Sequence, residues 1–578
     1  MTTTPFTFAV IADSHFHPAD DYSQSAYASD RQHNARNLAV VHAINTVAPD
    51  FVLHLGDIPH PVPGKAGHPA ALGVAQETYA QLCCPIYVVP GNHDVGDKPD
   101  GVAGVPSADP DKHAVFAAHW GPAFHAFDHK GVRFVWLDAP VLNSGTTFEA
   151  EQRAWLEADL AAAHDRGQRI FLAMHYPPFL CEPDELEHYD NVAEPARSWV
   201  LGLLERYSVE ALFCGHVHHF FWNRTGQTDH YLLPATSFMR PEYAELVPVA
   251  PTDDEFGRND VLKLGFALVH VADEGHRYEP VRTHVRQGQP PEPDVALSAG
   301  RDGPPRNPLG ISLRQNLGVT HDIPLGNLDA FRRKAARNDL FIQAMWELGI
   351  ERVRVPARDL VEPRARARLL ALAARGTQLH VFSTESETTE LQALLLQEAG
   401  SIATWEIVSQ QGLLPPSVQA GEALARGIDL CLSVVGGKPA GETAYFSHFP
   451  RQGFTADDPR LASIAQAPVQ WVMGRIGTDA SVTEQVDQLL SATQGVGLTA
   501  LVEFPRVDEG VAATDDAQVT ERVLEAFEVA QRYPQVQLFL DTFVDHDRGY
   551  YPRHGLLDRG GHPRDAFYAL KRAVYRAS

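Results

Sequence analysis

The chain of 578 residues has few cysteines and no long apolar run, and both absences limit what it can be. No stretch approaches the roughly 18 apolar residues that a membrane-spanning helix needs. The first residues lack a basic region followed by an apolar run, so no secretory signal is predicted. The five cysteines are odd in number and scattered, which argues against a disulfide framework and indicates reducing surroundings. We therefore expect a cytoplasmic protein without a membrane partner.

Positive charge is also scarce. The chain has 48 Lys and Arg against 73 Asp and Glu, a formal net charge of −25. Nucleic-acid polymers and anionic membranes are held by clustered Lys and Arg, so neither is an expected partner. A local site could still bind a small anion through metal ions.

The length is sufficient for two to four domains, each with its own core. The clearest boundary is segment 286–308, where Pro, Gly and polar residues replace any apolar period. We predict one domain over residues 1–285, a linker over 286–308 and a second domain over 309–578.

Both halves alternate strand-like and helical patterns, which predicts an α/β fold. In the first half, short apolar runs such as FTFAVIAD and FVLHLGD alternate with helical segments such as 149–166. The second half has eight strand candidates with helical segments between them, for example 327–348 and 481–490. Eight units in about 270 residues is the count and length of a (β/α)₈ TIM barrel.

Five polar blocks in the first half each follow an apolar strand run. This places their side chains at carboxyl ends of strands, where open α/β sheets build their sites. The blocks are Asp13-Ser-His15, Gly56-Asp57, Gly91-Asn92-His93-Asp94, His175 before Tyr-Pro-Pro, and Gly215-His216-Val-His218. Each block alone has an ordinary explanation as a turn, a cap or a buried histidine. Together they offer four histidines, two aspartates and one asparagine, which is enough for two metal ions.

With these blocks, residues 5–250 resemble the calcineurin-like metallophosphoesterase family. They are most similar to its branch of cyclic-nucleotide and glycerophosphodiester phosphodiesterases. The resemblance implies an α/β sandwich and two divalent metal ions. One ion would be held by Asp13, His15, Asp57 and His218, and the other by Asp57, Asn92, His175 and His216. Imidazole, carboxylate and amide ligands suit Mn, Fe, Zn or Co, so the sequence does not choose among them.

The resemblance also implies a reaction. Two cations about 3.5–4 Å apart lower the pKa of a bridging water, so that hydroxide can attack phosphorus near neutral pH. His93 is not a ligand in the family and is the candidate for donating a proton to the leaving group, with Asp94 orienting its ring. A purely supporting role for His93 stays open. A small organic phosphodiester is the predicted substrate on the branch resemblance alone.

Segment 16–37 is long for a strand-to-helix connection and is predicted to form part of the pocket rim. Candidate pocket residues in this segment and elsewhere are His17, Tyr22, His33, Asn34, Tyr176 and His219. For any one of these six residues, a solvated loop surface is the more common explanation.

The second half more faintly resembles glycoside-hydrolase barrels with two catalytic glutamates. Ser409 and Gln410 stand where such barrels carry the Asn-Glu pair of the general acid, whereas Glu503 stands at the nucleophile position. A neutral amide cannot supply the proton, so the barrel is predicted to be non-catalytic. It would shape the site, bind part of the substrate or mediate assembly, for example as a homo-oligomer.

Two alternatives remain open. One is a bifunctional phosphoesterase and glycosidase acting on phosphorylated sugars. The other is a binding or scaffold protein whose metal site is idle.

Overall fold

The computed structural model divides into two compact units, Met1–Pro304 with Thr320–Gln343, and Pro305–Val319 with Ala344–Ser578. None of the helices in the described part of the chain has the length and apolar character needed to cross a membrane. The structure describes residues 4–99, 106–246, 263–284, 290–295, 298–301, 303–326, 329–436, 451–478, 480–493, 495–504, 516–545, 555–558 and 560–578.

The first unit contains two large sheets. In the first, β1, β2 and β3 are parallel, and β10 and β11 continue the sheet in antiparallel fashion. Its order is β11 (Gly275–Arg282), β10 (Gly265–Ala272), β1 (Phe6–Ile11), β2 (Val52–His54) and β3 (Ile86–Val88). The second sheet has the order β4 (His125–His129), β5 (Val132–Trp136), β6 (Arg169–Met174), β7 (Ala211–Cys214), β9 (Thr228–Leu232) and β8 (Phe221–Thr225).

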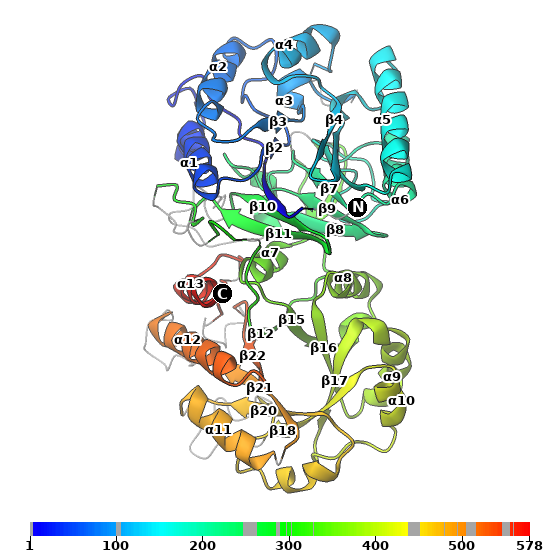
Figure 1. Cartoon of the computed structure of the whole chain (residues 1–578), viewed down its shortest axis with the longest axis vertical. Helices are drawn as coiled ribbons and strands as arrows, with labels where there is room; N and C mark the ends of the chain where they lie inside the picture. The colour runs from blue at the N-terminus through cyan, green and yellow to red at the C-terminus, as the bar shows by residue number, and fades with distance from the viewer. Residues whose placement is uncertain are drawn as a thin grey trace. The chain divides into compact units, whose positions relative to one another are not determined.

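The two sheets pack face to face through phenylalanine side chains. Phe8 of β1 lies against Phe134 of β5, Phe171 of β6 and Phe213 of β7, with ring centroids 5.2 to 6.0 Å apart. Helices cover the outer faces, and Figure 1 shows α1 and α2 on one side of this unit and α5 and α6 on the other. The α/β sandwich is thus confirmed. The helices are α1 (His33–Val47), α2 (His68–Tyr79), α3 (Asn92–Val95), α4 (Pro110–Trp120), α5 (Thr147–Asp165) and α6 (Ala196–Arg206).

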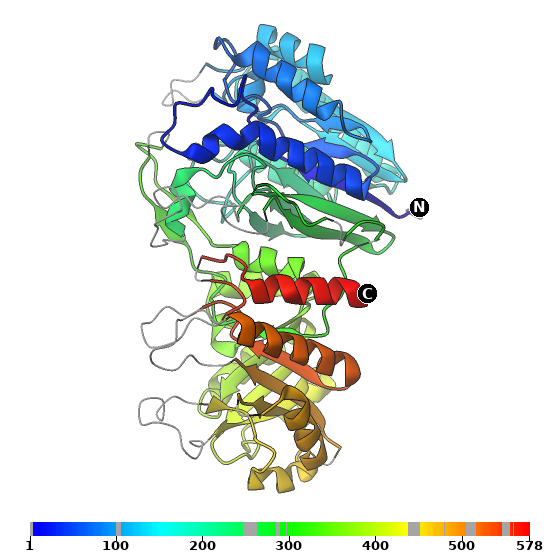
Figure 2. The same ribbon diagram turned by 90° about the vertical axis from the view of Figure 1, so that its left-hand side faces the viewer.

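Each outer face has its own apolar core. Val40 and Ile44 of α1 pack with Ile11 of β1 and Phe266 of β10, and Figure 2 shows α1 alongside the green strands β10 and β11. On the other side, α5 and α6 pack on β5, β6 and β7. The same core includes β13 (His321–Ile323) and β14 (Lys334–Ala336), an antiparallel pair from the returning segment Thr320–Gln343.

The second unit is a closed barrel of eight parallel strands, which confirms the predicted architecture. The ring closes because β12 pairs with β22 and β17 with β18. The strand order is β12 (Gly310–Ser312), β15 (Arg352–Pro356), β16 (Gln378–Thr384), β17 (Ile402–Ser409), β18 (Asp429–Gly436), β20 (Trp471–Ile476), β21 (Gly497–Glu503) and β22 (Gln537–Asp541). A short strand, β19 (Arg451–Gln452), pairs with β18 in antiparallel fashion.

Helices connect the barrel strands along its outside (Figure 1). They are α7 (Leu340–Glu347), α8 (Pro363–Ala374), α9 (Thr388–Gln397), α10 (Ala420–Ala425), α11 (Val482–Ala492), α12 (Asp516–Arg532) and α13 (Asp565–Ala577). The helix predicted over 481–490 corresponds to α11, which begins after Ser481, whose side chain accepts from the Glu484 amide. The helix predicted over 327–348 is wrong for most of its described length, because β14 lies at Lys334–Ala336 and only α7 is helical.

Candidate metal centre

The predicted ligand side chains meet where the strands of both sheets end. They follow β1, β2, β3, β6 and β7 at the carboxyl ends. Carbonyl and amide contacts tie the loops together, since the Asp13 amide donates to Gly56 O at 3.1 Å and the His15 amide to Asp57 O at 3.0 Å. All seven side chains are buried: Asp13, His15, Asp57, Asn92, His175, His216 and His218.

Five of the seven have a left-handed backbone. Such angles are uncommon in residues other than glycine, and clusters of them are typical of functional sites. The φ values are 53° at Asp13, 42° at His15, 59° at Asp57, 71° at His216 and 54° at His218.

Two glycines allow the loops to approach this closely. A Cβ on Gly91 would lie 2.3 Å from Asp57 Oδ1, and a Cβ on Gly56 would lie 2.6 Å from the Gly91 nitrogen. Gly56 also has a φ of 96°, which side chains rarely permit. The glycines of the Gly-Asp and Gly-Asn-His-Asp blocks therefore make room for Asp57.

The first group of side chains consists of Asp13, His15, Asp57 and His218, whose ligand atoms all lie within 4.8 Å of one another. His218 Nε2 is 3.3 Å from Asp13 Oδ1, and His15 Nε2 is 3.5 Å from Asp57 Oδ2. The two imidazole Nε2 atoms are 3.0 Å apart. Nitrogens and carboxylate oxygens that converge in this way can hold a cation.

The second group consists of Asp57, His175 and His216, whose ligand atoms also lie within 4.8 Å of one another. His175 Nε2 is 3.3 Å from Asp57 Oδ1. Asn92 Oδ1 joins this group, at 3.1 Å from His175 Nε2 and 3.2 Å from His216 Nδ1. Asp57 is thus shared, with Oδ2 toward the first group and Oδ1 toward the second.

Backbone carbonyls orient two of the histidines. His175 Nδ1 lies 2.7 Å from Leu55 O, and His218 Nδ1 lies 2.9 Å from Phe238 O. A ring nitrogen facing a carbonyl must carry the proton, which leaves Nε2 with its lone pair toward the cluster. A second ring nitrogen fixed in this way is typical of metal-ligating histidines.

The electrostatics also favour bound cations. Burial holds the pKa of His15 and of His216 well below the usual value, so both rings stay neutral, as ligands must be. Burial also disfavours charge on His175, yet the Asp57 carboxylate raises the pKa of His175 to about 9. The Asp57 carboxylate therefore stabilises positive charge beside it, although the site is buried. The residues fit two metal ions.

His93 lies beside this cluster and is partly exposed. Its ring centroid is 4.6 Å from that of His15, and its amide donates to Asp57 Oδ1 at 2.8 Å. His93 Nδ1 lies 2.5 Å from His60 O, so this carbonyl orients the ring. His60 is a residue that the sequence analysis missed, although it closely follows the Gly-Asp block.

The contacts of Asp94 differ from its predicted task of orienting the His93 ring. Its carboxylate accepts from the backbone amides of Asp57 at 2.7 Å, Gly91 at 2.8 Å and Ile58 at 3.1 Å. Burial and the neighbouring Asp57 charge raise the pKa of Asp94. Asp94 therefore holds the Asp57 loop in place.

A buried charged network supports His216 and was also missed. Asp190 Oδ1 is 3.4 Å from His216 Nε2. Asp190 Oδ2 in turn accepts from Tyr243 at 2.6 Å and from Lys334 at 2.5 Å. Asp190, Glu242 and Asp329 are close enough to hold a cation, but Lys334 pairs with all three carboxylates, and Arg240 pairs with Asp190 and Glu242 as well. In the sequence, the polar run His188-Tyr-Asp190-Asn could have indicated this network.

The predicted pocket-rim residues divide by burial. Tyr22 is exposed to 41% and fits a loop surface, whereas His17, His33 and His219 are buried. Tyr176 is buried as well, and its hydroxyl donates to the Asp97 carboxylate. For these buried residues the solvated-loop explanation is wrong.

In the barrel, Glu406 is fully buried on β17 and pairs with Arg354 Nε at 2.6 Å. His380 Nε2 lies 3.0 Å from the same carboxylate. Burial opposes its ionisation, but Arg354 and His380 together lower the pKa of Glu406 to about 2. A general acid needs a raised pKa, so Glu406 cannot take that role. Pro505 and the residues to 515 lie outside the described residues.

Known proteins resemble this chain within its first unit. Residues 6–220 match the family model described as calcineurin-like phosphoesterase. The serine/threonine-protein phosphatase CPPED1 of Danio rerio is 29% identical over 191 residues, 31% of this chain and 57% of that protein. The glycerophosphodiester phosphodiesterase GpdQ of Enterobacter lignolyticus is 29% identical over 223 residues, 36% of this chain and 70% of that protein.

The chain therefore spans a little over half the length of the CPPED1 relatives. Among solved structures, a dimetal phosphatase from Danio rerio matches with 14% identity and a TM-score of 0.33, covering 48% of this chain and 95% of that one.

Proposed function

We propose that the chain is a binuclear metal-dependent phosphoric ester hydrolase, and that its substrate is a small organic phosphodiester. The observation that carries the proposal is the shared Asp57, whose two oxygens face two separate groups of buried ligand atoms. A single structural cation would need only one such group.

Two divalent cations at these groups would activate a water and neutralise the charge that develops on phosphate. The chain's own residues supply the rest. Asp57 is fixed by the His93 amide and by Asp94, which holds its loop. His93 Nδ1 is occupied by His60 O, so Nε2 is the ring atom available to donate a proton to a leaving alkoxide.

The diester preference rests on the resemblance to the phosphodiesterase branch and on the name of the GpdQ relative. The CPPED1 relatives are named as phosphatases, so a phosphomonoester is the second candidate. Turnover of bis-aryl and mono-aryl phosphates, followed by glycerophosphodiesters and cyclic nucleotides, separates the two. A cytoplasmic location, the absence of a nucleic-acid or membrane partner, and homo-oligomer formation stay predictions.

The first test is Asp57→Asn. This substitution removes a carboxylate that both groups share, so we expect loss of bound metal and of phosphodiester turnover in a folded protein. Asp21→Asn is the matched control, because Asp21 is an exposed aspartate on a nearby loop. Full turnover by the chelated, metal-free protein would contradict the proposal.

A further inference from the structure

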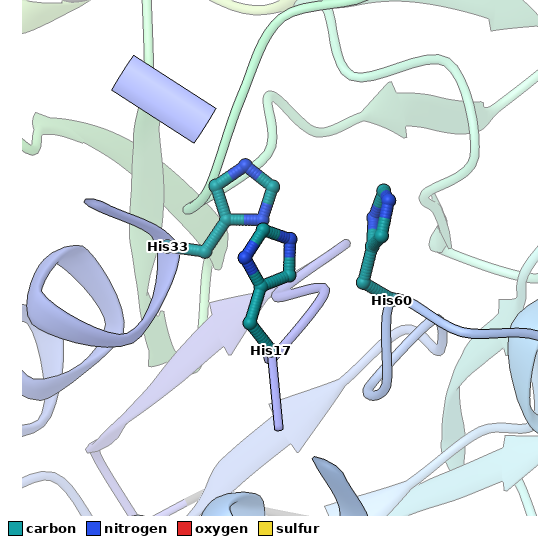
Figure 3. A group of neighbouring side chains, drawn as sticks. All are labelled: His17, His33 and His60. Carbon is teal, nitrogen blue, oxygen red and sulfur yellow. The ribbon is translucent and has the colours of Figure 1, made fainter. Parts of the chain in front are cut away.

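A second set of histidines lies beside the candidate metal centre. His17, His33 and His60, here called the histidine cluster, each offer a ring nitrogen within 4.8 Å of those of the other two. Figure 3 shows the three imidazoles together, carried by three separate segments. His33 is the first residue of α1, whereas His17 and His60 lie in the loops after β1 and β2. The ring centroids are 4.2 to 5.6 Å apart.

Backbone contacts bring these segments together. Phe16 and Pro59 form an isolated bridge between the two loops, and the His60 amide donates to Phe16 O at 2.9 Å. The Asn34 side chain holds His17 from both sides, accepting from its amide at 2.9 Å and donating to its carbonyl at 3.2 Å. The His33 ring stacks on Phe238 at 5.1 Å with an interplanar angle of 1°. Backbone contacts and ring stacking thus position the three imidazoles, largely without hydrogen bonds from their ring nitrogens.

Those nitrogens are buried and, among the described residues, lack hydrogen-bond partners. This holds for both ring nitrogens of His17, Nε2 of His33 and Nδ1 of His60. His33 Nδ1 faces His15 O at 3.0 Å and must carry the proton, which leaves Nε2 with its lone pair. His17 and His33 are each only 1% exposed. Buried polar atoms without partners are costly and rare, so several in one place indicate a ligand.

We propose that the histidine cluster is a third metal site, distinct from the two groups that share Asp57. Three imidazoles select a borderline ion such as Zn²⁺, Co²⁺, Ni²⁺ or Cu²⁺ over Mg²⁺ or Ca²⁺, which prefer oxygen. Three histidines with a fourth, open position are an established arrangement for zinc. The Asp30 carboxylate lies 3.8 Å from His33 Nε2 and adds negative charge.

A phosphate group is another ligand that three histidines can bind, and it is bound most strongly by protonated rings. Three cationic rings packed at these centroid distances would repel one another strongly. A cation bound by neutral rings avoids this cost. The site is also connected to the candidate metal centre formed by the two groups that share Asp57, here called the first centre, since the His60 carbonyl orients His93.

The test is the number of metal ions per chain. The full-length protein is stripped with a chelator, dialysed against Co²⁺ or Zn²⁺, passed through a desalting column and measured by mass spectrometry. We expect three ions in the wild type and two in His17→Ala and in His60→Ala. His42→Ala is the control for loss of a surface histidine, because His42 is exposed on α1, the helix that begins with His33. It should retain three.

A second measurement covers variants that fold poorly. Asp57→Asn disturbs only the first centre, so its Co²⁺ form should keep the visible absorption of one Co²⁺ ion at the histidine cluster. That absorption should disappear when His17→Ala is added. Two ions in the wild type and an unchanged count in His17→Ala would overturn the third site. Three ions without phosphoester turnover would instead contradict the proposed function and leave this site standing.

Discussion

His93 and Asp94 are adjacent in the sequence but face different partners. Asp94 points into the protein and accepts three backbone amides, whereas the His93 ring lies at the partly exposed edge of the metal centre. Only His93 is therefore placed to meet a substrate. The sequence predicted His93 as proton donor but could not show that a carbonyl in another loop orients it.

If His93 donates the proton, His93→Ala should retain both metals of the first centre and lose turnover by about 10²–10⁴-fold. The loss should be greater for alkyl phosphodiesters than for nitrophenyl esters, because a basic leaving group needs the proton more. Metal content and a leaving-group series measure this. An equal loss across the series would favour charge stabilisation or positioning.

Gly91 gives a test of packing around Asp57. In Gly91→Ala the new Cβ would meet Asp57 Oδ1 at 2.3 Å and its amide nitrogen at 2.4 Å. Asp57 must then move, and we expect weaker metal binding together with lower thermal stability. Gly202→Ala is the matched control, because Gly202 lies in α6 with nothing within 4 Å. It should gain about 0.5–1 kcal/mol of stability. Unchanged metal affinity in Gly91→Ala would contradict this account.

The sequence predicted where the candidate ligand side chains lie, because each of their blocks follows an apolar strand and the carboxyl ends of strands are where open α/β sheets build their sites. The sequence did not predict the burial of residues that are covered by segments distant in the chain. His17 and His33 lie in a polar segment that predicts a loop surface, but Phe238 covers His33 and the loop after β2 lies against His17. Burial by distant residues cannot be read from local composition.

At the level of elements, the same limit explains the wrong helix over 327–348. Lys334 and Arg337 of this segment are buried and make polar contacts within the first unit, where a surface helix would expose them to solvent. Arg337 Nη1 donates to Cys181 O at 3.0 Å, and Lys334 Nζ pairs with Asp190. Just before α7, the Asn338 side chain accepts from the Leu340 amide at 3.1 Å. The α/β alternation was predictable, but the return of this segment to the first unit was not.

Substitution of Lys334 tests how much the returning segment Thr320–Gln343 supports the metal centre. Lys334→Met leaves Arg240 as the remaining cation for Asp190 and Glu242 and removes the lysine that pairs with the buried Asp329. Removal of one partner of a buried ion pair costs about 3–5 kcal/mol. Arg332→Met, in the same segment, disturbs a half-exposed pair with Glu187 and should cost less than about 1 kcal/mol. Urea unfolding of the first unit compares them. Equal stability of the two variants would show that the network is not needed.

The barrel has its own buried charge pair, and it predicts a pH dependence. Arg354 and His380 lower the pKa of Glu406 to about 2, from the usual value of 4.5. A depressed pKa contributes stability above pH 4.5 that is lost as the pH falls toward 2. Glu406→Gln should therefore destabilise the barrel at neutral pH and flatten its acid dependence, as measured by urea midpoints across this range. Glu385→Gln, at an exposed site after β16, should behave as wild type.

For the whole molecule, the two units carry different kinds of polar cluster. In the first unit, ring nitrogens and carboxylates converge with lone pairs facing one another, and they can hold cations. In the barrel, Glu406 is already neutralised by Arg354, so this carboxylate is structural. Among the described residues, every group of side chains that could hold a metal ion lies in the first unit.

The last prediction is that the barrel has no glycosidase activity. A retaining mechanism needs two carboxyl groups about 5–5.5 Å apart, one of them protonated. Glu503 ends β21 and is partly exposed, but Gln410 occupies the predicted acid position and Glu406 is held ionised. Assays need natural glycosides as well as nitrophenyl sugars, because a single carboxylate can attack an activated glycoside weakly. Turnover of an unactivated glycoside that is abolished by Glu503→Ala and unaffected by Asp57→Asn would establish a second active site and support the bifunctional alternative.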